Sequence, residues 1–180
     1  AAVRDPAVKG IWCVPKYSNP QGIVYSDAVV DRLAALRPAA PDFALMWDNA
    51  YCLHEVYGQF VPFRDMLTLC REAGNADMVY EFASTSKITF PGAGVAVMAA
   101  SEANLKYLSG LLGAQTISYD KVNQLRHVRF LQDKAHVLEL MQRHAAILRP
   151  KFEAVLAALR GIAPLGIASW TEPKGGYFVS

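Results

Sequence analysis

The chain has 180 residues, of which 53% are hydrophobic and 19% are charged, and its mean hydropathy is +0.15. This composition excludes a disordered chain and predicts a large apolar core, with some apolar surface left for contact with further protein. The net charge of +2 comes from scattered lysines and arginines, so no nucleic-acid partner is expected.

The first two thirds of the chain alternates strand patterns with helix patterns. An alternation of this kind predicts an α/β fold, with a mostly parallel sheet flanked by helices. We expect strands over residues 8–14, 43–47, 78–82 and 94–99, and helices over residues 27–37, 62–73 and 102–112.

The character of the chain changes at about residue 119. Residues 119–161 have a helical pattern almost throughout, with Pro150 as the expected kink, and residues 162–180 return to a strand-and-turn composition. We therefore predict that residues 1–130 belong to a large domain. Residues 131–180 would form a connector helix and the start of a smaller α+β domain.

No membrane span or secretory signal is predicted. The longest uncharged stretch, within residues 88–102, is interrupted by one proline and two glycines, and no basic start precedes an apolar run. Three cysteines, Cys13, Cys52 and Cys70, form no Cys-x-x-Cys pair and indicate thiols in a reducing compartment, so a cytoplasmic location is expected. The four histidines show no metal-ligand spacing, and no metal site is expected.

Polar side chains follow three of the predicted strands. Asn19 comes after the first strand, Asp48 and Tyr51 after the second, and Lys87 after the third. In an open parallel sheet, ligands bind beyond the carboxyl ends of the strands. The sequence therefore predicts one binding site made from these residues.

Lys87 is the central candidate. A partly desolvated lysine with a lowered pKa forms a Schiff base with an aldehyde, and the hydroxyls of Ser84 and Ser86 beside it suit a phosphate group. The alternatives are a solvated surface lysine and an ordinary polar turn.

Each of the other candidates also has a structural alternative. Asp48 could hold a proton on a cofactor ring nitrogen, or it could cap a turn. Tyr51 could donate to a cofactor oxygen or fill a gap in the core. Asn19 could reach the same oxygen, or Asn-Pro-Gln-Gly could be only a turn.

Taken in order, these motifs resemble the landmarks of class I aminotransferases, which are pyridoxal 5'-phosphate (PLP) enzymes of fold type I. The motifs are Asn-Pro-Gln-Gly at 19–22, Asp-Asn-Ala-Tyr at 48–51, Ser-Thr-Ser-Lys at 84–87 and Gly-Gly-Tyr-Phe at 175–178. Residues 47–51, 84–95 and 121–127 further resemble the aspartate-aminotransferase-like subgroup of MocR type. The resemblance covers essentially the whole chain.

The resemblance implies a PLP-dependent transaminase that is normally a homodimer and acts on an amino acid, aspartate or similar, and a 2-keto acid. Lys87 would form the Schiff base and shuttle protons, and Asp48 would partner the pyridine nitrogen. Asn19 and Tyr51 would contact the 3-oxygen, and Ser84 the phosphate.

The sequence departs from the family pattern at Gly94, where an arginine usually grips the phosphate. Hydroxyls of Ser86 or Thr89 and backbone N–H groups would have to compensate. The family's glycine-rich phosphate turn lies upstream of Ala1 and its substrate-binding arginine downstream of Ser180, so we expect a middle segment of a longer enzyme.

Two rival functions remain open on the same scaffold. One is the PLP-binding domain of a transcriptional regulator, which would have a basic DNA-binding head upstream. The other is a PLP lyase or decarboxylase, which would release ammonia or CO₂ instead of passing an amino group to a keto acid.

Overall fold

The computed structural model describes residues 1–180 and divides them into two compact units. The first, here called the sheet unit, comprises residues 1–13, 25–50 and 63–126. The second, here called the helical unit, comprises residues 14–24, 51–62 and 127–180. None of the helices combines the length and apolar character that a bilayer span requires.

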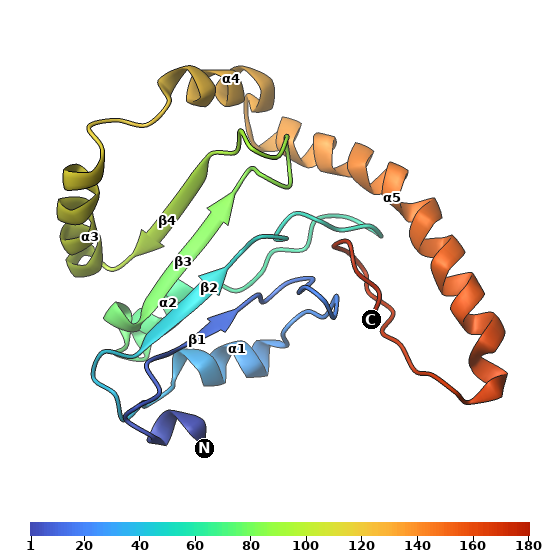
Figure 1. The fold of residues 1–180 in the computed structure, drawn as a ribbon, viewed down its shortest axis with the longest axis horizontal. Helices are drawn as coiled ribbons and strands as arrows, with labels where there is room; N and C mark the ends of the chain where they lie inside the picture. The colour runs from blue at the N-terminus through green and yellow to red at the C-terminus, as the bar shows by residue number, and fades with distance from the viewer. The chain divides into compact units, whose positions relative to one another are not determined.

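The sheet unit contains one mixed sheet of four strands in the order β1-β2-β3-β4 (Figure 1). The strands are β1 (Gly10–Cys13), β2 (Ala44–Asp48), β3 (Val79–Ser84) and β4 (Ala96–Ala100). The first three are parallel, which confirms the predicted mostly parallel α/β sheet, whereas β4 is antiparallel to β3. The reversal follows from the short link over residues 85–95, because a parallel crossover needs about a dozen residues or more.

Two short helices accompany the parallel strands. Helix α1 (Asp27–Ala34) begins where predicted, since the Ser26 side chain accepts a hydrogen bond from the Val29 N–H at 3.4 Å. Helix α2 (Met66–Glu72) begins four residues later than predicted. The Asp65 carboxylate accepts from the Thr68 N–H at 3.2 Å and caps the helix there.

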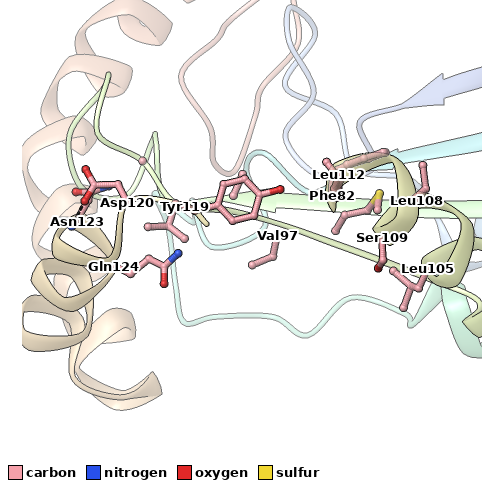
Figure 2. A pocket seen from close by; sticks show the side chains of 14 residues that line it. Phe82, Val97, Leu105, Leu108, Ser109, Leu112, Tyr119, Asp120, Asn123 and Gln124 are labelled. Carbon is pink, nitrogen blue, oxygen red and sulfur yellow. Dashed lines mark hydrogen bonds between the residues drawn. The ribbon is translucent and has the colours of Figure 1, made fainter. Parts of the chain in front are cut away.

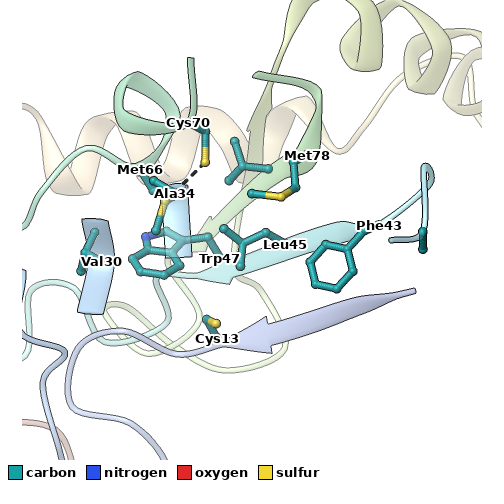
Figure 3. Packing of buried hydrophobic residues seen from close by; sticks show 11 residues of the cluster. Cys13, Val30, Ala34, Phe43, Leu45, Trp47, Met66, Cys70 and Met78 are labelled. Atoms are coloured by element: carbon teal, nitrogen blue, oxygen red, sulfur yellow. Dashed lines mark hydrogen bonds between the residues drawn. The ribbon is translucent and has the colours of Figure 1, made fainter. Parts of the chain in front are cut away.

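The core of the sheet unit lies between β2 and these two helices (Figure 3). Leu45 and Trp47 of β2 are fully buried against side chains of both helices, which include Val30, Ala34, Met66 and Cys70. The Trp47 ring also contacts the rings of Tyr25 and Phe63, with centroids 6.0 and 6.1 Å apart. Each such buried side chain contributes about 1.5–3 kcal/mol. This packing fixes the end of β2, where Asp48 lies.

The structure confirms that residues 119–161 are helical almost throughout, but it divides them into two helices. The structure has α3 (Glu102–Gln115), which was expected, and then α4 (Lys121–Leu131) and α5 (Lys134–Ile162) as separate helices. Gln132 adopts a left-handed backbone with φ 56°, and Asp133 caps α5 through the His136 N–H at 3.0 Å. Short 3₁₀ turns complete the chain at Ala2–Arg4, Ala76–Met78 and Ala163–Leu165.

In the helical unit, backbone hydrogen bonds join two loop segments, residues 54–57 and residues 174–176. The Val56 N–H donates to the Lys174 carbonyl at 3.0 Å and the Gly176 N–H to the His54 carbonyl at 2.8 Å. Glu55 and Gly175 form an isolated antiparallel bridge. The C-terminal segment thus pairs with residues 54–56, although it forms no full strand.

Candidate functional site

The turn that carries Lys87 follows β3 in the sheet unit and is pinned at its base. The Ile88 and Thr89 N–H groups donate to the Thr85 carbonyl at 2.9 and 2.8 Å. Thr85 in turn is bonded to Val95 twice, through its own N–H and through its hydroxyl, each at 2.9 Å. The turn is therefore locally fixed.

The Lys87 side chain is exposed. The structure therefore does not supply the desolvation that the sequence argument assumed for this amine. The turn follows the carboxyl end of β3. Ser84 and Ser86, by contrast, are half-buried.

Gly94 lies directly against Ser86. A Cβ atom added to Gly94 would lie 3.0 Å from both the backbone N and Cα of Ser86, and closer still to its hydroxyl. No side chain, and least of all an arginine, fits at this position without moving Ser86. The neighbouring Ala93 carbonyl accepts a hydrogen bond from the Asn123 side chain at 2.8 Å, so α4 helps to hold this segment in place.

Asp48 is the last residue of β2 and lies at the same end of the sheet as the lysine turn. Its register partner is Phe82 of β3, two residues before that strand ends. The indole N–H of Trp12 donates to the Asp48 carboxylate at 3.3 Å, and the Trp12 ring stacks on that of Phe82, with centroids 6.0 Å apart. Asp48 caps no helix. Sequence reasoning missed Trp12, whose only signal was its place in the first strand.

The loop after Asp48 is held by a second pair of polar residues. The Asn49 N–H donates to the Phe82 carbonyl at 2.8 Å, and the Asn49 amide donates to the Glu81 carboxylate. Burial raises the pKa of Glu81, and the hydrogen bond from Asn49 opposes that shift. The Asn49–Glu81 contact ties the loop after β2 to β3.

Asn19 belongs to the helical unit, where it is exposed in a tight turn. The Gly22 N–H donates to the Ser18 carbonyl at 2.6 Å and the Ser18 N–H to the Ile23 carbonyl at 3.1 Å. Gly22 has φ 65°, and a Cβ on it would lie 2.9 Å from the Phe178 carbonyl. Only glycine fits there, because the backbone is left-handed and the C-terminal segment is so close.

Tyr51 is buried in the helical unit, at 3% exposure. Its ring makes edge contacts with those of His54, Tyr177 and Phe178, with centroids 5.6, 6.0 and 6.1 Å apart. The structure thus brings two motifs together that are separated by more than a hundred residues in sequence. Burial, together with the nearby Tyr51, raises the pKa of Tyr177.

The six predicted residues are divided between the two units. Asp48, Ser84, Ser86 and Lys87 lie in the sheet unit, at the carboxyl ends of neighbouring parallel strands. Asn19 and Tyr51 lie in the helical unit. Nowhere in the structure do three or more His, Cys, Asp or Glu side chains gather as a metal site would require.

A separate apolar groove of about 780 Å³ lies in the sheet unit among β4, α3 and the start of α4 (Figure 2). Val97, Leu105, Leu108 and Leu112 line it, and Asp120 is the one charged residue in its lining. The Asp120 carboxylate accepts from the N–H of Asn123 at 2.9 Å and so caps α4. The groove therefore offers apolar surface and no obvious catalytic group.

Comparisons of the sequence with a family model and with curated proteins agree on one family. The model of the aspartate amino-transferase family matches residues 1–180. A provisionally named aminotransferase of Mycolicibacterium smegmatis is 51% identical over 177 residues, or 98% of this chain and 41% of its own length. An aspartate aminotransferase of Corynebacterium glutamicum is 45% identical over 179 residues, or 99% of this chain and 41% of its own length.

Solved structures give the same result. The crystal structure of an aspartate transaminase from Corynebacterium glutamicum superposes with a TM-score of 0.96 at 45% identity, covering 99% of this chain and 42% of that one. An α-aminoadipate aminotransferase from Thermus thermophilus, complexed with N-(5'-phosphopyridoxyl)-L-leucine, gives 0.71 at 26% identity, covering 93% and 41%. The chain thus spans about two fifths of the length of the curated relatives that it matches.

Proposed function

The chain belongs to the aspartate amino-transferase family, and we propose on that basis that it forms part of a PLP-dependent transaminase. Its reaction would move an amino group between an amino acid, aspartate or similar, and a 2-keto acid. The observation that carries this proposal is the common position of Asp48 and the Lys87 turn, at the carboxyl ends of two neighbouring parallel strands. The chain covers about two fifths of the length of each relative, which supports the proposal that it is a segment of a longer enzyme. We assign this enzyme to the MocR-type subgroup.

The donor set of the sheet unit fits PLP. One amine, one carboxylate at the neighbouring strand end and two half-buried serine hydroxyls are the groups that an aldehyde, a ring nitrogen and a phosphate would need. In the helical unit, the buried Ser18 hydroxyl next to Asn19 has no hydrogen-bond partner within the chain, which suits a segment that faces a further polar group. When bound, PLP supplies an electron sink that stabilises negative charge on the amino-acid α-carbon.

Each residue then has a definite task. The Lys87 amine would bind the cofactor aldehyde and would carry a proton to and from the substrate carbon. The Asp48 carboxylate, which the Trp12 indole contacts, would hold a proton on the ring nitrogen. Tyr51 and Asn19 of the helical unit would donate to the 3-oxygen.

The phosphate would be held without the arginine usual in the family. We assign its grip to the hydroxyls of Ser84 and Ser86 and to backbone N–H groups of the lysine turn. Gly94 supports this assignment, because a side chain at this position would displace Ser86 from the place where its hydroxyl would bind the phosphate.

Gly94→Ala should therefore weaken PLP binding about tenfold, since the new Cβ displaces Ser86 and removes about one charge-assisted hydrogen bond. The measurement is the PLP dissociation constant of the full-length protein by equilibrium dialysis. Gly110→Ala is the control, because a Cβ at that position in α3 meets nothing within 4 Å. Equal PLP affinity in the wild type and in Gly94→Ala would contradict the assignment of the phosphate site.

The reaction class is tested by product analysis. Full-length protein with PLP, aspartate and a 2-keto acid should form a new amino acid and the keto acid of aspartate in equal amounts. Free ammonia or CO₂ without a new amino acid would instead indicate a lyase or a decarboxylase. Cofactor binding without turnover would favour the regulatory domain.

The proposed enzyme is a cytoplasmic homodimer. Three free thiols support a reducing compartment. Large apolar side chains remain exposed on β4 and α3, among them Val97, Tyr107 and Leu111, which supports further protein contact there. Light scattering after size-exclusion chromatography should give twice the mass of the full-length chain. A single-chain mass at micromolar concentration would contradict the dimer.

A further inference from the structure

The helical unit contains a buried ion pair between Lys16 and Glu55. The two residues are only 3% and 5% exposed. The Lys16 ammonium donates to the Glu55 carboxylate, to the Cys52 carbonyl at 3.0 Å and to the Val61 carbonyl at 2.8 Å. These three bonds use all three ammonium protons.

Aromatic rings enclose this ammonium. It lies 4.9 Å from the ring centroid of Phe60 and 5.4 Å from that of Tyr17, within range of cation–π attraction. Burial, together with the nearby Glu55 carboxylate, raises the pKa of Tyr17 to about 12. With every proton engaged and no open face, Lys16 is not a second candidate for the amine that binds the cofactor.

The ion pair joins the two segments that carry the predicted cofactor contacts of this unit. Lys16 lies three residues before Asn19, and the Cys52 carbonyl that it binds belongs to the residue directly after Tyr51. Glu55 binds the other side of the same loop, because its carboxylate also accepts from the Val61 N–H at 3.3 Å. One charge pair thus sets the spacing between residues 14–24 and residues 51–62.

A buried pair of this kind is a poor source of stability alone, because desolvation of both charges offsets most of their attraction. Its distinctive property is that a charge removed from water accepts only a narrow range of partner geometries. The pair therefore selects one arrangement of the two segments over others of similar packing.

We propose that Lys16 and Glu55 are positioning residues that hold Asn19 and Tyr51 in the arrangement in which both reach the 3-oxygen of PLP. The inference rests on the proposed function. Neither charged side chain touches the cofactor in this account. Both act through the backbone segments that they join.

The test compares full-length Lys16→Met and Glu55→Gln with the wild type. Methionine keeps the length of the lysine stem and removes its three donors, whereas glutamine keeps a carbonyl oxygen for Lys16 and Val61 and removes only the charge. Arg160→Met is the control, because it breaks an exposed ion pair with Glu172 in the same unit. The readouts are the PLP dissociation constant, the visible absorbance band of bound PLP, the split between kcat and KM, and the melting temperature without PLP.

Lys16→Met should raise the PLP dissociation constant and lower kcat by about 10- to 100-fold, as a displacement of about 1 Å in a positioned group does. Its visible band should shift, and KM for the amino acid should change little. Glu55→Gln should show the same changes to a smaller degree. Arg160→Met should match the wild type in every readout.

A lower melting temperature with unchanged PLP affinity, band and kcat would show a merely structural pair and overturn the proposal. If Lys16→Met does not fold, Glu55→Gln decides by the same criteria. Measurements on the wild type distinguish failure of the proposed function from failure of the positioning role. If it binds no PLP, the proposed function fails and the positioning role with it, whereas an active wild type with unaffected variants contradicts the positioning role alone.

Discussion

Lys87→Ala is expected to abolish transamination by the full-length protein, with a loss of about 10⁴-fold or more in kcat. A positioned acid–base group contributes up to about that factor, and in the proposed enzyme the same amine would also be the point of covalent attachment. The variant should still bind PLP, because the carboxylate and hydroxyl contacts remain. The measurement is the initial rate of keto-acid formation at saturating amino acid.

The matched control is Lys106→Ala, which removes an exposed lysine of α3 in the same unit. It should retain wild-type turnover. Addition of a small primary amine should restore part of the activity of Lys87→Ala, because a free amine can carry the proton that the side chain no longer carries. Near-normal turnover in Lys87→Ala would show that another group performs the chemistry.

Asp48→Ala is expected to lower kcat about 10³-fold, which corresponds to about 4 kcal/mol of transition-state stabilisation. In the proposed enzyme the carboxylate would hold the proton on the ring nitrogen, and without it negative charge on the substrate carbon would be less well stabilised. Asp48→Asn should lose nearly as much, although it keeps the shape of the side chain and an acceptor for the Trp12 indole.

Asp42→Ala serves as the control, because Asp42 forms only an exposed ion pair with Lys9. Both Asp48 variants should melt within a few degrees of the wild type, since the side chain is half-buried at a strand end. A loss of only a few-fold in kcat, with a large loss of stability, would assign Asp48 a structural role instead.

The sheet and the place of the lysine turn could be predicted from sequence, because they depend on local patterns. Short apolar runs ending in polar residues marked β2 and β3, and Ser26 and Ser101 marked two helix starts through their own side chains. Asp48 is the last residue of β2, and Lys87 follows β3, the neighbouring parallel strand.

Features that depend on distant partners could not be predicted in this way. Lys16 meets Glu55 and Trp12 meets Asp48 across 39 and 36 residues, and nothing in either local sequence indicates the pairing. The break between α4 and α5 depends on the left-handed backbone at Gln132, a residue type that commonly continues a helix. The exposure of Lys87 likewise depends on contacts with distant parts of the chain. The local sequence of the turn does not indicate these contacts.

The most direct test of the central claim is to locate the cofactor on the chain. Reduction of the PLP-loaded full-length protein with borohydride turns the link between amine and aldehyde into a stable secondary amine, and digestion with mass spectrometry identifies the modified residue. We predict the added phosphopyridoxyl mass on Lys87 alone. The same mass on Lys16 or another lysine, or on none, would contradict the account.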